Sequence, residues 1–245
     1  MKFFALSDIG KVRRENQDAW QEYYEPNRNA AALVVCDGMG GAAAGRIAST
    51  MAAENFISHL RRCLSGAELP SPDDMLRDAA AYANLQLYNQ AFLHAEYRGM
   101  GTTLVGAVVL GERVSVVNVG DSRAYVWRKE QGLQAITTDH SFVAELLARG
   151  KITPEQAKHH PKRNIITRAL GMDADVRSDV FHPDGEGEGR FLFCTDGLTN
   201  VVSDEEIAEQ ISIHTEPEPC CRALVKIALE RGASDNVTAA VLFTD

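Results

Sequence analysis

Apolar residues recur along this chain with two different spacings, and the alternation between them predicts the order of strands and helices. Short apolar runs bounded by turn residues indicate buried strands, and they cover residues 2–8, 30–36, 102–110, 113–119, 124–128, 133–136, 176–181, 190–195 and 236–243. Apolar residues at helical spacing, several after Ser or Thr caps, indicate helices; these cover 42–64, 71–98, 141–170, a segment opening at 203, and 218–231. Because strands are grouped with strands and helices with helices, the pattern favours an α+β fold over a doubly wound sheet. There is neither an internal repeat nor a linker, so we expect one domain over 1–245.

Composition narrows the class of protein. The 245 residues are 45% hydrophobic and 24% charged, which is typical of a folded globular protein. A net charge of −9 is a poor match to a nucleic-acid backbone, so we expect no nucleic-acid partner. Five cysteines, an odd number without a C-x-x-C spacing, indicate neither a disulfide framework nor a cysteine zinc site. No apolar run approaches the roughly 18 residues of a membrane helix and no signal sequence is recognisable, so we expect a cytoplasmic protein with no membrane partner.

Three of the most apolar predicted strands end on an aspartate with a glycine beside it, and a fourth aspartate precedes the last strand. These positions are Asp37-Gly38, Gly120-Asp121, Asp196-Gly197 and Asp235. Antiparallel packing could bring the four carboxylates to one end of the fold, where they would repel one another unless a cation neutralised them. All-oxygen ligation selects Mg²⁺, Mn²⁺ or Ca²⁺ rather than zinc. The alternative is that each Asp-Gly is only a turn, which is the commoner meaning of a single one.

Two other features bear on the ligand of such a site. Residues 38–43 match G-x-G-x-x-A between a strand and a helix, a pattern typical of dinucleotide binding. Asp37 would face the incoming pyrophosphate, and region 54–59 is predicted helix rather than a second strand, so an NAD-dependent oxidoreductase is the weaker hypothesis. Arg13 and Arg14 supply positive charge near the first strand, and an arginine beside a metal suits a phosphate group.

Eight short motifs follow one another over almost the whole chain, from residue 13 to 238. They are R-x-x-N-Q-D (13–18), D-G-M-G-G (37–41), G-T-T (101–103), N-V-G-D-S-R (118–123), T-x-D-H-S (137–141), I-T-R-A-L-G (166–171), T-D-G-L (195–198) and S-D-N-V-T (234–238). With these motifs in this order, the chain resembles the metal-dependent protein serine/threonine phosphatases of the PP2C (PPM) family, in their compact bacterial form. The resemblance implies two packed antiparallel β-sheets flanked by helices, an αββα sandwich.

The resemblance also implies roles for the matching acidic residues. Asp37 would bridge two core metal ions, Mn²⁺ or Mg²⁺, and the carbonyl of Gly38 would hold one of them. Asp196 and Asp235 would complete the pair, so that the three aspartates form the implied catalytic set. Asp18 would act through bound water.

A third, weaker metal position is implied at Asp121 with Asp196, and Arg13 fits the family's phosphate-binding arginine. The implied reaction is hydrolysis of phosphoserine and phosphothreonine by direct attack of a hydroxide that bridges the two core ions. No Cys, Ser or His is placed by a motif as a nucleophile, so we expect no phosphoenzyme. The implied partners are phosphorylated proteins and the serine/threonine kinase that the enzyme opposes, and we expect a monomer.

Two residues depart from the family pattern. Gln17 stands where many relatives have glutamate, which removes one water-mediated contribution to the metal shell. Met39 stands where animal relatives carry a histidine proposed as general acid, so the group that protonates the leaving alcohol is unassigned. His140 is a candidate for that role, although capping of the next segment is the better interpretation of its place in T-x-D-H-S.

The segment 141–170 corresponds to the family's flap beside the site. It holds six Lys or Arg and two Glu, a local charge of +4 that would attract acidic phosphorylated segments or simply form a solvated helical face. Two further hypotheses stay open. A catalytically silent scaffold of the same fold is disfavoured because the acidic positions are filled, and a calcium-binding module is disfavoured because no D-x-[DN]-x-[DN]-G loop is present.

Overall fold

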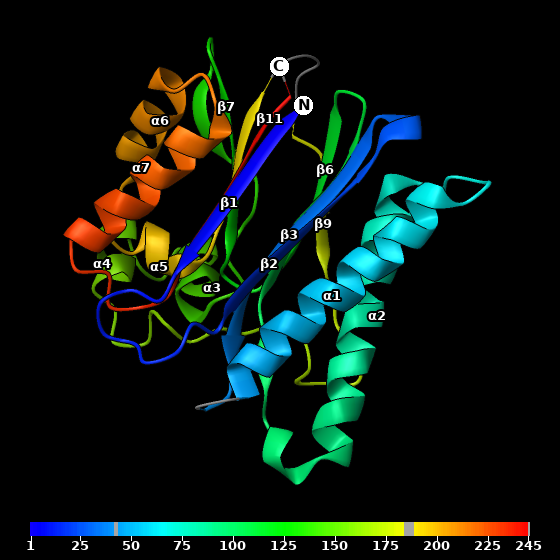
Figure 1. The fold of residues 1–245 in the computed structure, drawn as a ribbon. Coiled ribbons are helices and arrows are strands. Elements are labelled where there is room, and N and C mark those ends of the chain that lie inside the picture. The colour runs from blue at the N-terminus through cyan, green and yellow to red at the C-terminus, as the bar shows by residue number, and fades with distance from the viewer. Residues whose placement is uncertain (42–43, 184–188, 245) are drawn as a thin grey trace.

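The computed structural model describes residues 1–41, 44–183 and 189–244, and its centre is a pair of antiparallel β-sheets packed face to face (Figure 1). The first sheet contains β1 (Lys2–Asp8), β7 (Arg123–Arg128), β8 (Gly132–Ala135), β10 (Arg190–Cys194) and β11 (Val237–Phe243), in the order β1-β11-β10-β7-β8. The second contains β2 (Asp18–Glu25), β3 (Ala30–Met39), β5 (Leu104–Leu110), β6 (Arg113–Val119) and β9 (Asp179–Phe181), in the order β2-β3-β5-β6-β9. A short strand, β4 (Gly101–Thr102), pairs with the end of β3.

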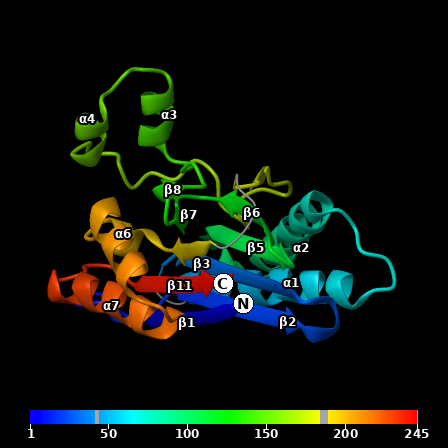
Figure 2. The same cartoon turned by 90° about the horizontal axis from the view of Figure 1, so that it is seen from above.

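Helices cover the outer face of each sheet (Figures 1 and 2). The second sheet is covered by α1 (Ala44–Ser65) and α2 (Pro72–Leu93), and the first by α6 (Asp204–Ile213) and α7 (Pro217–Glu230). Short helices form the remainder: α3 (Phe142–Ala148), α4 (Pro154–Lys158), α5 (Asp196–Thr199) and the 3-10 turns η1 (Pro26–Arg28) and η2 (Ala95–Tyr97). The arrangement confirms the predicted α+β fold with two packed sheets flanked by helices.

The side chains of β3 point alternately to the helices on one face of the strand and to the other sheet on the opposite face. Val34 and Cys36 face α1 and α2, whereas Leu33 and Val35 face the other sheet, as the two-residue period of a strand requires. Asp37 continues the series of Leu33 and Val35, so its carboxylate is directed to the space between the two sheets.

The segment 141–170, predicted to be helical, is helical only in part. Only α3 and α4 are helical within 141–170, and Figure 2 shows both standing away from the sandwich. Gly150, with φ +63°, follows α3, and Pro161 excludes continuation of α4 because proline lacks the N–H that a helix interior needs. The two ends of the segment lie side by side, since Phe142 N–H donates to the Ile165 carbonyl at 2.8 Å.

Several predicted boundaries also differ from the structure. Strand β3 runs past Asp37 to Met39, α2 ends at Leu93 instead of 98, and β9 covers only the last part of 176–181. Strand β2 was absent from the sequence prediction, because its polar and aromatic residues form no apolar run. The predicted helix start at 42–43 lies outside the described residues. None of the helices in the described ranges combines the length and apolarity needed to cross a membrane.

The ring of Phe56 joins α1 to the second sheet. It is fully buried over Gly106 of β5, where a Cβ would lie only 2.8 Å from its Cε1 atom. We expect Phe56→Ala to lower the free energy of unfolding by about 3–5 kcal/mol, because a cavity would remain between helix and sheet. The matched control, Phe92→Ala, removes a ring that is 79% exposed and should change stability by less than about 0.5 kcal/mol. Urea unfolding of both variants checks this; similar losses would contradict it.

Candidate active site

Acidic side chains from both sheets meet at one end of the sandwich. Asp18, at the start of β2, lies directly opposite Asp37 in the β2–β3 register. Asp196 follows β10, Asp235 precedes β11, and Asp121 follows β6. The pKa of Asp37 is raised well above its ordinary value, first by burial and then by the negative charges of the four other aspartates. The structure therefore brings the five predicted acidic positions into one electrostatic cluster.

Glycine permits the close approach of these acidic segments. A Cβ on Gly197, next to Asp196, would collide with the carbonyl oxygen of Asn236. Gly10 has a φ of +78°, and a Cβ there would collide with the carbonyl oxygen of Asp235. Glycine alone tolerates such contacts, and at Gly10 also the left-handed backbone. The glycine after Asp196 is thus required by close packing between the start of α5 and the residue before β11, and the Asp-Gly pair is not a simple turn.

Asp18 links the two sheets, but only one of its two carboxylate oxygens has hydrogen-bond partners among the described residues. Its Oδ2 accepts hydrogen bonds from the hydroxyl of Thr195 at 2.9 Å, directly after β10, and from that of Thr238 at 2.6 Å, in β11 of the opposite sheet. Its Oδ1 is buried without a partner among the described residues. Burial, and after it the charges of Asp196 and Asp235, raise the pKa of Asp18 to about 7, although the threonine hydrogen bonds lower it.

The donor set fits a divalent cation. A buried carboxylate oxygen without a partner and several mutually repelling carboxylates are what a hard cation with oxygen ligands would neutralise. Among the described residues, however, no three acidic, histidine or cysteine side chains are already arranged around one ion position. Two of the carboxylates are engaged by neighbours, because Asp235 is paired with Arg13 and Asp196 Oδ2 accepts from Asn200 at 3.0 Å.

Arg13 is the cation placed at the rim of this cluster. Its Nη2 lies 2.8 Å from Asp235 Oδ2, and about half of its side chain is exposed. The hydrogen bond to Asp235 is the main cause of its raised pKa, and Asp37 and Asp196 contribute. An ion bound to Asp235 would compete with this guanidinium, and a displaced Arg13 would remain within reach of a phosphate at the same rim.

Asn236 is a positioning residue that the sequence reasoning missed. Its amide nitrogen donates to the carbonyls of Ile9 at 2.9 Å and Glu15 at 3.0 Å, and its oxygen accepts from the Gln17 N–H at 2.9 Å. The loop that carries Arg13 is therefore held against the start of β11. Its partners lie more than 200 residues away in sequence. The one signal of this role in the sequence is therefore the position of Asn236 directly after Asp235.

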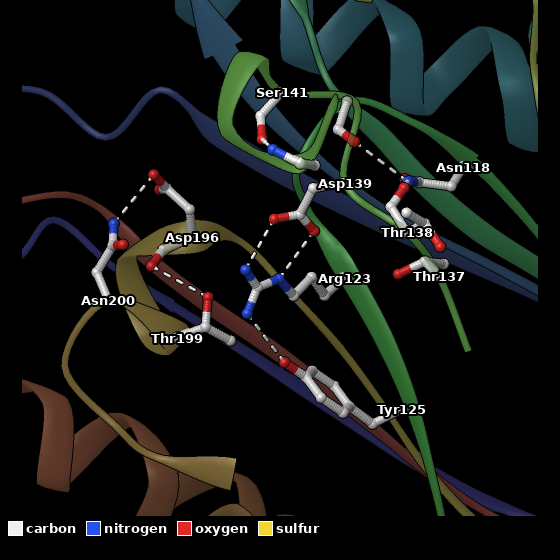
Figure 3. A network of polar contacts seen from close by, with 12 residues as sticks. Asn118, Arg123, Tyr125, Thr137, Thr138, Asp139, Ser141, Asp196, Thr199 and Asn200 are labelled. Carbon is white, nitrogen blue, oxygen red and sulfur yellow. Dashed lines mark hydrogen bonds and ion pairs between the residues drawn. The ribbon is translucent and has the colours of Figure 1, made fainter. Parts of the chain in front are cut away.

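A second hydrogen-bond network centres on Arg123, two residues after Asp121 in the chain, and Figure 3 shows it. Arg123 binds the carboxylate of Asp139 with two hydrogen bonds, of 2.9 and 2.7 Å, and also reaches the Tyr125 hydroxyl at 3.3 Å. Burial is the largest cause that raises the pKa of Asp121 to about 7, followed by the charges of Asp196 and Asp139, and Arg123 lowers it. The bidentate pair joins β7 to Asp139, two residues before the segment 141–170.

Gln17, one of the two departures from the family pattern, and His140 both have hydrogen-bond partners in the structure. The Gln17 side chain donates to the Gly41 carbonyl at 3.0 Å, which ties the loop before β2 to the residues after β3. The predicted capping role of His140 is wrong, since Ser141 caps α3. His140 is buried, accepts from the Gly120 N–H at 3.0 Å through Nδ1, and lies 3.0 Å from Asp179 through Nε2. Because both ring nitrogens are engaged, the geometry argues against His140 as the acid for the leaving group.

Removing the Asn236 amide should loosen the loop that carries Arg13. We expect Asn236→Ala to lower the free energy of unfolding by about 2–4 kcal/mol, because it leaves two carbonyls and one N–H without their partner. The control is Asn89→Ala, at an exposed position of α2, with an expected change below about 0.5 kcal/mol. Urea denaturation measures both; equal stability of Asn236→Ala and the parent would contradict the role.

Comparison with known proteins agrees with this geometry. The family model described as protein phosphatase 2C matches residues 11–217. The serine/threonine phosphatase Stp of Listeria monocytogenes is 33% identical over 239 residues, covering 98% of this chain and 94% of the relative. Protein phosphatase PhpP of Streptococcus pneumoniae is 33% identical over 244 residues, covering 99% and 97%.

A solved structure gives the same result. The crystal structure of serine/threonine phosphatase Stp1 from Staphylococcus aureus superposes with a TM-score of 0.87 at 38% identity, covering 98% of this chain and 93% of that one. The family match spans the acidic residues at 18, 37, 121 and 196, and the relatives extend it over nearly the whole chain. The chain therefore belongs to the protein phosphatase 2C family.

Proposed function

We propose that this chain hydrolyses phosphoserine and phosphothreonine esters in proteins, with divalent metal ions held at the acidic end of the sandwich. The family and the names of the bacterial relatives support a protein serine/threonine phosphatase. The single observation that carries the mechanism is the convergence of negative charge from Asp18, Asp121, Asp196 and Asp235 on Asp37.

In this proposal Asp37, Asp196, Asp235 and the Gly38 carbonyl hold two ions, Mn²⁺ or Mg²⁺, and Asp18 acts through water. The unpartnered Oδ1 of Asp18 and the mutual repulsion of the carboxylates support this ligand set. When bound, such a pair of ions lowers the pKa of water and neutralises phosphoryl oxygens. The aspartates would position the ions and take no covalent part.

Arg13 would orient the substrate. Its planar guanidinium can hold two phosphoryl oxygens at once, and its place beside Asp235 puts it at the edge of the same centre. When Asp235 binds an ion, Arg13 would exchange Asp235 for a phosphate group of the substrate. Binding of the ions would therefore be coupled to binding of the substrate.

The attacking group would be water, because the nearby side chains are poor nucleophiles. Burial raises the pKa of the Cys194 thiol to about 12, and it also raises that of Cys36, so both thiols stay neutral. The Ser122 hydroxyl is fully buried and hydrogen-bonded to Thr103 Oγ1 at 2.7 Å. Neither type of group is activated for attack.

The proposal also covers a third ion, the oligomeric state, the location and the partners of the enzyme. A third, weaker ion would lie at Asp121 with Asp196, near the charge of Asp139. The enzyme would act as a monomeric catalytic unit in the cytoplasm, opposing a serine/threonine kinase, and the basic residues of 141–170 would attract phosphorylated segments.

Activity assays test the metal requirement directly. We expect hydrolysis of a phosphoserine peptide and of p-nitrophenyl phosphate with Mn²⁺, and none after chelation. Asp196→Asn should lower kcat by at least about 100-fold, because one ligand of the ions loses its charge. Asp78→Asn, at an exposed site on α2, is the control and should keep full activity. Turnover that survives chelation or Asp196→Asn would refute the mechanism, and Mn²⁺ binding without turnover would indicate a silent scaffold.

The crowded carboxylates also predict a dependence of stability on pH in the absence of metal. The pKa of Asp18 is about 7 in the folded chain and about 4 in the unfolded chain. The folded state therefore keeps its proton longer, and this contribution to stability is lost as pH rises from about 4 to about 7. In EDTA, Asp18→Asn should stabilise the protein relative to the parent by about 2–4 kcal/mol at pH 8 and little at pH 4. Urea unfolding at both pH values checks this, and an equal effect at the two would be inconsistent with it.

A further inference from the structure

Met172 is an exposed apolar side chain on a loop that is firmly held. Its exposed fraction is 51%. On one side of it the Gly171 N–H donates to Asn84 Oδ1 at 2.8 Å, and on the other side Asn84 Nδ2 donates to the carbonyls of Asp173 and Ala174, both at 3.0 Å. Asn84 itself is 1% exposed on α2. The loop is thus ordered before anything binds, which lowers the entropy cost of a contact with Met172.

The same loop places Met172 beside the strand that carries Asp37. A Cβ on Gly101 would lie 3.1 Å from the Met172 sulfur. Gly101 is the register partner of Met39, and directly paired residues of antiparallel strands project to the same face. Met39 lies two residues beyond Asp37 on β3, and alternate residues of a strand share a face. The side chains of Met39 and Met172 therefore adjoin one another on the face to which Asp37 belongs.

We name these two side chains the methionine shelf, and both are accessible. Met39 is partly exposed and Met172 about half exposed. Their thioethers are flexible and polarizable, so they adapt to apolar groups of different shape. Backbone pairing between Thr102 and Leu170, at 3.1 and 2.9 Å, holds the chain that leads to Met172 against β4. Strand β4 in turn pairs with the end of β3, which carries Met39. The shelf is an apolar surface next to a centre that is otherwise lined by charge.

We propose that the methionine shelf binds an apolar side chain of the substrate within two residues of the phosphorylated serine, and so gives the phosphatase a sequence preference. This inference rests on the proposed function. Met39 is two residues from Asp37 along a strand, a distance of roughly 7 Å. An extended substrate advances about 3.3–3.6 Å per residue, so a phosphate at the Asp37 centre brings the first or second neighbouring residue to the shelf.

Three phosphoserine peptides of equal charge test the preference. One carries leucine at the two positions before the phosphoserine, one at the two positions after it, and one carries glutamine at all four. We expect the parent enzyme to prefer one leucine peptide over the glutamine peptide by about three- to tenfold in kcat/KM, as partial burial of leucine allows. Met172→Gln should bring this ratio close to one, and Met172→Leu should restore it.

The ratio is measured within each variant, so a general loss of activity cancels. Ile213→Gln is the matched control, because Ile213 is 61% exposed at the end of α6, and it should leave the preference intact. A parent enzyme without preference, or a Met172→Gln variant that keeps it, would overturn the inference while leaving the phosphatase proposal standing. Absence of Mn²⁺-dependent turnover on all three peptides would instead count against the proposed function.

Discussion

Repulsion between buried carboxylates is the constraint around which this structure is organised. Five aspartates from separate segments lie within electrostatic reach of one another. For four of them, Asp18, Asp37, Asp121 and Asp196, burial alone already disfavours the charged form and raises the pKa. The fold offsets this cost with specific contacts: the hydroxyls of Thr195 and Thr238 donate to Asp18, and the guanidinium of Arg13 binds Asp235. Such a cluster persists only because two large apolar sheets hold its members in place, since the hydrophobic burial of the sandwich far exceeds the local penalty.

The sequence predicts those parts of the molecule in which hydrophobic burial decides the local structure. The inner strands are apolar runs, and nearly all were found within one or two residues. Strand β2 was missed because it lies at the edge of its sheet, where alternate residues remain exposed and the apolar signal is weak. The flap was assigned too much helix because polar residues at helical spacing do not show where Gly150 and Pro161 end each helix.

Four acidic positions were predictable for a different reason, since Asp37, Asp121 and Asp196 stand at the ends of apolar strands beside a glycine and Asp235 precedes another such strand. Asp18 begins a strand without an apolar run, and only the family resemblance indicated it. The residues that hold these acidic segments in place could not be predicted from the sequence. Asn236 contacts Ile9, Glu15 and Gln17, more than 200 residues away along the chain, and no local pattern encodes such a contact. The same holds for Asn84, whose amide joins α2 to the loop after Leu170. Polar residues that hold distant segments together become visible only in three dimensions, although their side chains decide where the charged groups lie.

The two ends of the segment 141–170 lie side by side, and we call this paired base the neck of the segment. The chain leaves the sandwich and returns to it at adjacent points, because Thr167 N–H donates to the His140 carbonyl as Phe142 N–H does to that of Ile165. Lengthening or replacing the residues beyond such a neck adds little loop-closure entropy and leaves both sheets unchanged. Residues 143–164 can therefore change in length and sequence while the two sheets and the acidic cluster between them keep their geometry.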